Sequence, residues 1–114
     1  MNLDHEVKGD VLVITPADRR IDAAVAIQFK DRMREMSATA GDRIVLDLGQ
    51  VDFVDSSGLG AIVAAMKQLG QGSRLELAAL TPNVAKVFRL TRMDTVFPIH
   101  DSVDAALGAA VSHG

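Results

Sequence analysis

The sequence predicts an α/β fold in which about four helices pack on a mixed, mostly parallel sheet of about five strands. Two patterns support this prediction. Short apolar runs alternate with longer segments whose apolar residues recur at helical spacing, and turn residues such as Gly and Pro separate them. Hydrophobic residues make up 48% of the 114 residues, which is enough for a packed core. We therefore expect one domain over residues 1–114.

The first half is expected to hold a hairpin, a helix and a buried strand. The turn residues Lys8-Gly9-Asp10 separate two short segments that could pair, and the second is the apolar run Val11-Leu12-Val13-Ile14. Residues 17–21 are predicted to be a polar connection. Asp22 is typical of a helix N-cap at the start of the next apolar-periodic segment. The near-continuous apolar run 44–48 is typical of a parallel strand buried on both faces.

Proline positions organise the second half. Thr81-Pro82 predicts a helix with proline in its first turn, whereas Pro98 within a short apolar run indicates an edge strand. Asp101 or Ser102 is expected to cap a final helix. The expected elements after the hairpin are a helix at 22–38, a strand at 44–48, a helix at 61–69, a strand at 75–80, a helix from 81, a strand at 95–99 and a helix at 103–111.

The composition argues against several classes of function. The formal net charge is −3 and aromatic residues are only 4%, so neither nucleic acid nor an anionic membrane is an expected partner. Cys is absent and the three histidines are scattered, which gives no thiolate and no metal-ligand cluster. We find no signal-peptide pattern and no apolar run near the roughly 20 residues of a membrane span. We therefore expect a cytoplasmic protein.

The most informative stretch is Val51-Asp52-Phe53-Val54-Asp55-Ser56-Ser57-Gly58-Leu59-Gly60. It lies where a predicted strand gives way to a predicted helix. Function often concentrates at such carboxyl ends of strands. A helix start also offers free backbone N–H groups and the positive end of the helix dipole, which favour an anion.

The two serines have two possible roles at this junction. One can be the helix N-cap, whose side-chain oxygen accepts a backbone N–H, and we expect this to be Ser57. The other can be an exposed hydroxyl that receives a phosphoryl group, and we expect this to be Ser56. Asp55 would repel such a phosphate while the helix start would attract it, which suits a switch better than a permanent anion site.

Enzymatic roles have little support in this stretch. Gly58 and Gly60 fit close helix–sheet packing, and their spacing matches neither a Walker A loop nor a dinucleotide fingerprint. The Gly-x-Ser-x-Gly pattern of a nucleophile elbow is absent as well. We therefore predict no catalytic residue, no cofactor and no metal, although a small enzyme that uses Ser56 remains an alternative.

The junction and the strand before it resemble the signature of the STAS domain, specifically that of the bacterial anti-sigma factor antagonists. The resemblance rests on Ile44-Val45-Leu46-Asp47-Leu48 followed by Asp55-Ser56-Ser57-Gly58-Leu59-Gly60, with further similarity in residues 77–88. The order of elements is similar over nearly the whole chain. The resemblance implies a STAS-like single domain over residues 1–114.

The resemblance also implies a mechanism and a set of partners. In this family an anti-sigma factor, which is an ATP-dependent serine kinase, phosphorylates the serine that corresponds to Ser56. The unphosphorylated antagonist binds the anti-sigma factor and frees a sigma factor, and a metal-dependent serine phosphatase restores this form. Asp22 and Asp55 match family aspartates near the phosphorylated loop. The rest of the expected phosphosite loop and partner surface is Ser57, Gly58, Leu59 and Gly60.

The chain departs from the family pattern next to this surface. Thr15-Pro16-Ala17-Asp18-Arg19-Arg20-Ile21-Asp22 replaces a shorter Thr-Gly-Glu-Leu-Asp, and Val25 stands where the family has threonine. Thr91-Arg92-Met93 replaces Ser-Gly-Leu. A second interpretation is therefore a STAS scaffold without a phosphorylation switch, such as a subunit of a lipid-transport or stress-signalling complex.

Overall fold

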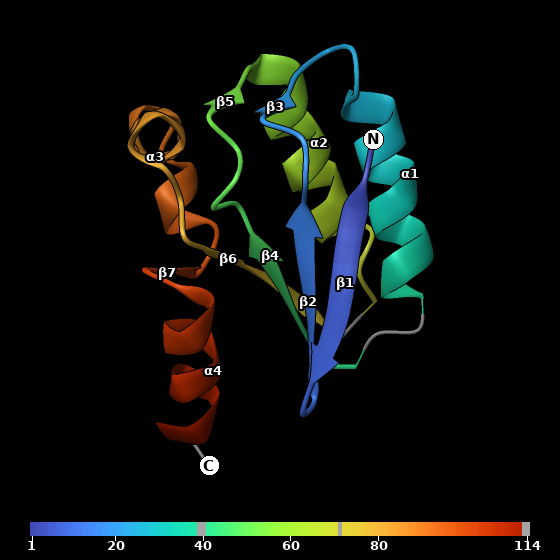
Figure 1. Cartoon of the computed structure of the whole chain (residues 1–114), viewed down its shortest axis with the longest axis vertical. Helices are drawn as coiled ribbons and strands as arrows, with labels where there is room; N and C mark the ends of the chain where they lie inside the picture. Colours follow the sequence, from blue (N-terminus) through green and yellow to red (C-terminus); the bar gives the residue numbers. More distant parts are fainter. Residues whose placement is uncertain (39–40, 71, 113–114) are drawn as a thin grey trace.

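The computed structural model describes residues 1–38, 41–70 and 72–112, and the described elements form a sheet covered by helices (Figure 1). The elements in chain order are β1 (Leu3–Lys8), β2 (Val11–Pro16), β3 (Arg20–Ile21), α1 (Ala26–Ser37), β4 (Arg43–Asp47), β5 (Phe53–Val54), α2 (Ser56–Lys67), β6 (Arg74–Ala78), α3 (Pro82–Leu90), the 3-10 turn η1 (Met93–Thr95), β7 (Ile99–His100) and α4 (Val103–Ser112).

Five strands form the main sheet in the order β1-β2-β4-β6-β7. β1 and β2 are an antiparallel hairpin whose register runs from Leu3 opposite Pro16 to Lys8 opposite Val11. Gly9 in their turn has a φ of 62°, a left-handed conformation that favours glycine. The pairs β2–β4, β4–β6 and β6–β7 are parallel. The prediction of a mixed, mostly parallel sheet is therefore confirmed.

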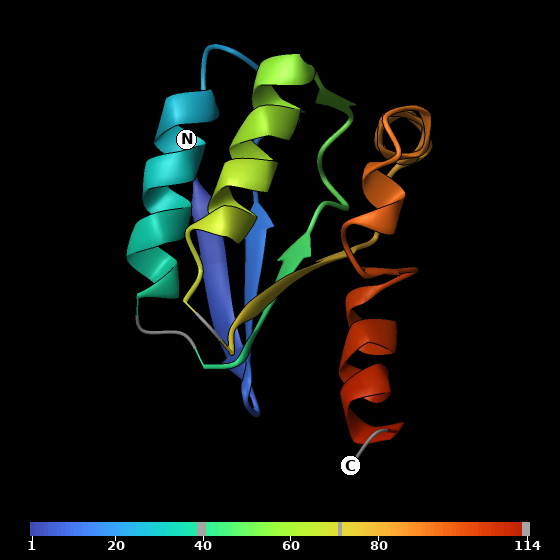
Figure 2. The same cartoon turned by 180° about the vertical axis from the view of Figure 1, so that it is seen from behind.

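Alternate residues of the central strands face two hydrophobic layers, because successive side chains of a strand point to opposite faces. Ile14 and Ile44 belong to the larger layer, which includes side chains of α1 and α2. These two helices lie side by side (Figure 2). Val13 and Val45 belong to a smaller layer with Ala106 of α4. No helix within the described residues is long and apolar enough to cross a membrane.

A second sheet of two short strands follows β2 and β4 along the chain, and the sequence patterns did not reveal it. β3 and β5 are parallel, with Arg20 opposite Phe53 and Ile21 opposite Val54. Ile21 and Val54 are buried, whereas Arg20 and Phe53 are exposed. The prediction of a polar connection was wrong for these residues because two-residue strands are too short to show a period. This small sheet leads directly into α2.

Several element boundaries also differ from the prediction. The helix expected at 61–69 begins earlier, at Ser56, because a cap and a close packing contact described below compensate for the two glycines of its first turns. Most of the strand expected at 95–99 is absent. Phe97 instead turns inward and packs edge to face on Phe88, with ring centroids 6.0 Å apart. The short β7 that remains is the edge strand, as the proline predicted.

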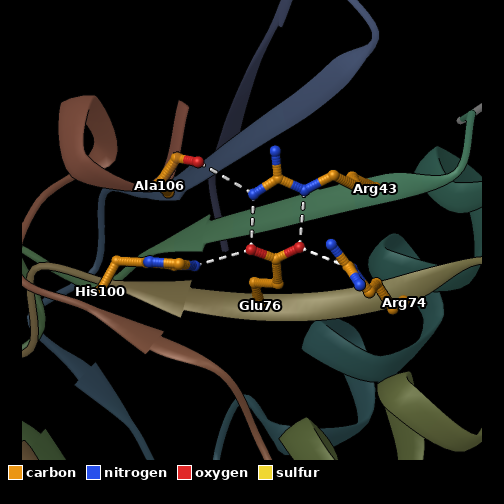
Figure 3. Close-up of polar contacts among 5 residues, drawn as sticks. All are labelled: Arg43, Arg74, Glu76, His100 and Ala106. Atoms are coloured by element: carbon orange, nitrogen blue, oxygen red, sulfur yellow. Dashed lines mark hydrogen bonds and ion pairs between the residues drawn. The ribbon is translucent and has the colours of Figure 1, made fainter. Parts of the chain in front are cut away.

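The polar side chain of Glu76 is buried in the middle of the main sheet, on the face that carries α4 (Figure 3). Arg43 on the neighbouring strand donates two hydrogen bonds to its carboxylate, from Nε and Nη2, each 2.6 Å long. Arg74 donates a third of 2.9 Å, and Nε2 of His100 lies 2.7 Å from Oε1. Nη2 of Arg43 also donates to the backbone carbonyl of Ala106 in α4 at 3.0 Å.

This Glu76 cluster holds its carboxylate in the charged form. Burial by itself raises the pKa of Glu76, but the hydrogen bonds from Arg43, His100 and Arg74 outweigh burial and lower that pKa to about 2. The hydrogen bond to Glu76 in turn raises the pKa of Arg43. The cluster therefore joins β4, β6 and β7 and ties α4 to the sheet through charged hydrogen bonds.

Candidate phosphorylation and partner-binding site

The start of α2 is fixed by Asp55, not by a serine. Asp55 is the N-cap residue, and its Oδ1 accepts a hydrogen bond of 2.8 Å from the backbone N–H of Gly58. Its Oδ2 accepts a second one, of 3.2 Å, from the backbone N–H of Ala23. The expectation that Ser57 caps the helix was wrong, because the Asp55 carboxylate reaches two backbone donors that a serine hydroxyl cannot reach together. One carboxylate thus joins the β5–α2 junction to the segment before α1.

Neither serine is therefore needed as the cap of α2. Ser56 and Ser57 are the first two residues of α2, and both are exposed. Neither hydroxyl has a hydrogen-bond partner among the residues that the structure describes. Their side chains can therefore be modified without breaking any contact seen here.

Gly58 and Gly60 differ in what surrounds them. A Cβ on Gly58 would overlap the carbonyl oxygen of Ile21 and come within 2.7 Å of its carbonyl carbon. Only glycine therefore allows α2 to pack this closely on β3. A Cβ on Gly60 would meet nothing within 4 Å. Leu59 between them is half-buried against the larger hydrophobic layer.

Asp22 lies next to this junction, although it does not cap α1 as the sequence suggested. α1 begins at Ala26, and the residue before it, Val25, makes no side-chain cap. The Oδ1 of Asp22 instead accepts from the backbone N–H of Ala24 at 3.1 Å, which forms a turn ahead of the helix. Its Oδ2 accepts from Nε of Arg20 at 3.2 Å. Asp22 therefore helps to shape the loop that Asp55 holds.

The exposed side of the small sheet is charged and partly aromatic. The guanidinium of Arg20 lies over the ring of Phe53, 4.2 Å from the ring centroid, and Phe53 is 40% exposed. Nε of Arg19 donates to Asp52 at 2.9 Å. Both arginines lie in the segment that was expected to be a polar connection next to the partner surface. The parallel pairing of β3 with β5 places the arginines beside the segment that carries Ser56 and Ser57, which we call the serine loop. This pairing had no signal in the sequence.

No imidazole hydrogen-bonds to either serine within the described residues. The imidazole of His100, the histidine nearest a strand end, hydrogen-bonds with Glu76 in the cluster described above. Asp55 is engaged with two backbone donors, so it is an orienting group of the loop. No group of three or more His, Cys, Asp or Glu side chains in the described parts of the chain could hold a metal ion. The two serine hydroxyls are exposed at the start of α2.

The fold and this junction define a STAS domain, and comparison with known proteins agrees. The sequence profile of the STAS domain matches residues 2–106, so the chain belongs to the STAS domain family. The anti-sigma-B factor antagonist of Listeria monocytogenes is 32% identical to the chain over 103 residues, which cover 87% of this chain and 90% of that protein.

Solved structures give the same result for the fold. An anti-sigma factor antagonist from Mycobacterium paratuberculosis superposes with a TM-score of 0.85 at 27% identity, over 95% of this chain and 92% of that one. The unphosphorylated form of the anti-sigma factor antagonist SpoIIAA superposes with a TM-score of 0.78 at 21% identity, over 97% of each chain. The latter likeness concerns the fold alone.

Proposed function

We propose that the chain is an anti-sigma factor antagonist whose binding to an anti-sigma factor is switched off by phosphorylation at Ser56. The observation that carries this proposal is the free, exposed Ser56 hydroxyl at the start of a helix whose cap is supplied by the preceding Asp55. Two further facts support it. The curated relatives at about one-third identity are anti-sigma factor antagonists, and SpoIIAA, which has the same fold, is known in a phosphorylated form.

The proposed partners are an anti-sigma factor that is also a serine kinase, and a serine phosphatase. The kinase transfers the γ-phosphoryl group of ATP to Oγ of Ser56. The bond to the β-phosphate breaks, ADP leaves, and the hydroxyl proton passes to a base on the kinase. The phosphatase hydrolyses the phosphate ester to regenerate the hydroxyl. In this proposal the chain itself is not an enzyme, needs no cofactor, and acts in the cytoplasm on neither nucleic acid nor membrane.

The switch would act through charge and desolvation. A neutral serine hydroxyl can be buried at an interface at modest cost, whereas a phosphate adds about −1.5 to −2 charges that must be desolvated or paired. Asp55 and Asp22 already make this loop acidic. Ser56, Ser57, Leu59 and Gly60 would form the contact surface, with Gly58 and Asp55 holding it in shape and Asp22 at its edge.

Two substitutions test the proposal against the anti-sigma factor kinases encoded in the same genome. We expect Ser56→Ala to bind the anti-sigma factor about as tightly as the wild type does. Ser56→Asp should bind it at least about tenfold more weakly, and calorimetry measures both affinities. Ser102→Asp is the matched control. It adds the same charge at the start of another helix, where Ser102 accepts from the N–H of Ala105 and Asp is an equally good cap.

Wild-type affinity for Ser56→Asp would contradict the switch. Mass spectrometry after incubation with ATP then assigns the modified residue. If no encoded kinase labels the chain, the scaffold without a switch becomes the better interpretation.

A further inference from the structure

A hollow of about 180 Å³ lies between α1 and α2, beside the serine loop. Of the two serines, only Ser57 lines it, because adjacent positions on a helix point in different directions. The residues around the hollow are Ala26, Ile27, Lys30, Ser57, Gly60, Ala61 and Ala64. Ser57 and Lys30 are thus the two lining residues that carry polar side chains.

Lys30 has no counter-charge in the described parts of the chain. Its side chain is half-buried at the wall of the hollow, and no hydrogen bond or ion pair engages its ammonium there. The neighbouring carboxylate of Asp31 is directed elsewhere, to Arg34 at 3.5 Å. A half-buried lysine without a carboxylate partner, lining the same hollow as a free hydroxyl, is a favourable position for an added anion.

The surroundings of Ser56 differ in sign. Ser56 directly follows Asp55, whose carboxylate is held in place by the backbone N–H groups of Gly58 and Ala23. A phosphate on Ser56 therefore lies beside a fixed negative charge. A phosphate on Ser57 would lie in the hollow with Lys30. The two adjacent hydroxyls are unequal acceptors, although both are exposed and share the same helix start.

We propose that Ser57 is a second phosphorylation site of this chain and that Lys30 holds its phosphate in the hollow between α1 and α2. The inference rests on the kinase of the proposed function as the source of the phosphoryl group. Oγ of Ser57 forms a bond to the γ-phosphorus of ATP, the bond to the β–γ bridging oxygen breaks, ADP leaves, and a base of the kinase takes the proton.

The hollow has room for the added group. Liquid water occupies about 30 Å³ per molecule, so a hollow of 180 Å³ can receive the three free oxygens of a phosphate. A phosphate held there would bridge α1 and α2. The phosphate on Ser56 would project to solvent and to partners, whereas the phosphate on Ser57 would be held by the protein itself.

The physical part of the proposal can be tested without a partner protein. Phosphoserine is incorporated at position 56 or 57 during translation, and the phosphate of each intact protein is titrated by phosphorus NMR. We expect the second pKa of the phosphate to be lower at position 57 than at position 56, by about 0.3 pH units or more. Lys30→Gln should remove this difference. Lys86→Gln, which removes an exposed lysine on α3, is the matched control and should leave it unchanged.

If the phosphate at position 57 has the same second pKa in the protein with Lys30 and in the Lys30→Gln variant, the assignment of Lys30 is overturned. The acceptor role is tested by mass spectrometry of the wild type after reaction with the kinase. Label on both serines supports the proposal, whereas label on Ser56 alone overturns it and leaves the proposed function intact. A chain that no kinase labels at all contradicts both.

Discussion

Two charged regions of the molecule, the serine loop at the start of α2 and the Glu76 cluster, contain similar residue types but differ in burial and pairing. In the Glu76 cluster the glutamate is 1% exposed, and two arginines and a histidine converge on its carboxylate. In the serine loop the ion pairs of Arg19 and Arg20 lie at the surface, and two hydroxyls have no partner within the described residues. Both oxygens of the buried carboxylate are paired, whereas the exposed serine hydroxyls are not paired within the described residues.

The largest effect expected from this comparison is the loss of Glu76. Glu76→Ala leaves the guanidinium of Arg43 nearly buried without its counter-charge, so we expect the free energy of unfolding to fall by about 3–5 kcal/mol. Urea denaturation measures this change. The double variant Glu76→Leu with Arg43→Met removes both charges and should recover much of the loss. A double variant as unstable as Glu76→Ala would show that packing, not the unpaired charge, causes the defect.

The Glu76 cluster should also make stability depend on pH in a defined window. The folded-state pKa of Glu76 is lowered from 4.5 to about 2, so this group stabilises the fold above pH 4.5, and the contribution is lost as pH falls toward 2. Its size is on the order of 3 kcal/mol. Denaturation curves of the wild type and Glu76→Gln between pH 2 and 7 should converge at the acid end. A difference that is constant over this range would contradict the assignment.

Within the serine loop, the stability of the fold should depend more on the glycine that packs against β3 than on the glycine at the surface. Gly58→Ala places a methyl group on the backbone carbonyl of Ile21, which cannot move as a side chain does, and we expect a loss of about 1–3 kcal/mol. Gly60→Ala, two residues away in the same helix, meets nothing and should be neutral or stabilising by up to about 1 kcal/mol. Thermal unfolding of the two variants gives the comparison, and equal melting temperatures would refute the contact with β3.

The smallest effect is expected at the surface ion pairs. Asp52→Asn removes the partner of Arg19, whose side chain is 80% exposed, and should change stability by less than about 1 kcal/mol. The change should shrink further at about 0.5 M salt, because added salt screens exposed ion pairs. A loss as large as that of Glu76→Ala would show that the two regions are not energetically distinct.

The sequence was sufficient for the main sheet and its helices because these depend mostly on long, periodic segments. The parallel strand at 44–48, the helix that begins at Pro82 and the edge position next to Pro98 all follow from local patterns. The position of the serine loop at a strand–helix junction was predictable for the same reason. The roles of Ser56 and Ser57 as modified residues stay predictions.

Contacts between distant segments were not predictable. The sequence offered Ser56 and Ser57 as possible caps of α2. Only the folded chain shows that Asp55 caps this helix and that its second oxygen accepts from the backbone N–H of Ala23, far away in sequence. Glu76 lies in an alternating pattern typical of an exposed strand residue. Its burial depends on Arg43 from the adjacent strand and on α4, neither of which a local pattern can place.

The contact between Gly58 and Ile21 has a consequence for how the signature of this loop should be interpreted. A variant of this chain without either serine would still need Asp55 to cap α2 and Gly58 to let α2 pack against β3. Asp55 and Gly58 in the signature therefore indicate this architecture, and the proposed regulation concerns only the serines between them. Under the proposed function, a version that phosphorylation cannot switch off needs changes at the serines alone and keeps Asp55 and Gly58.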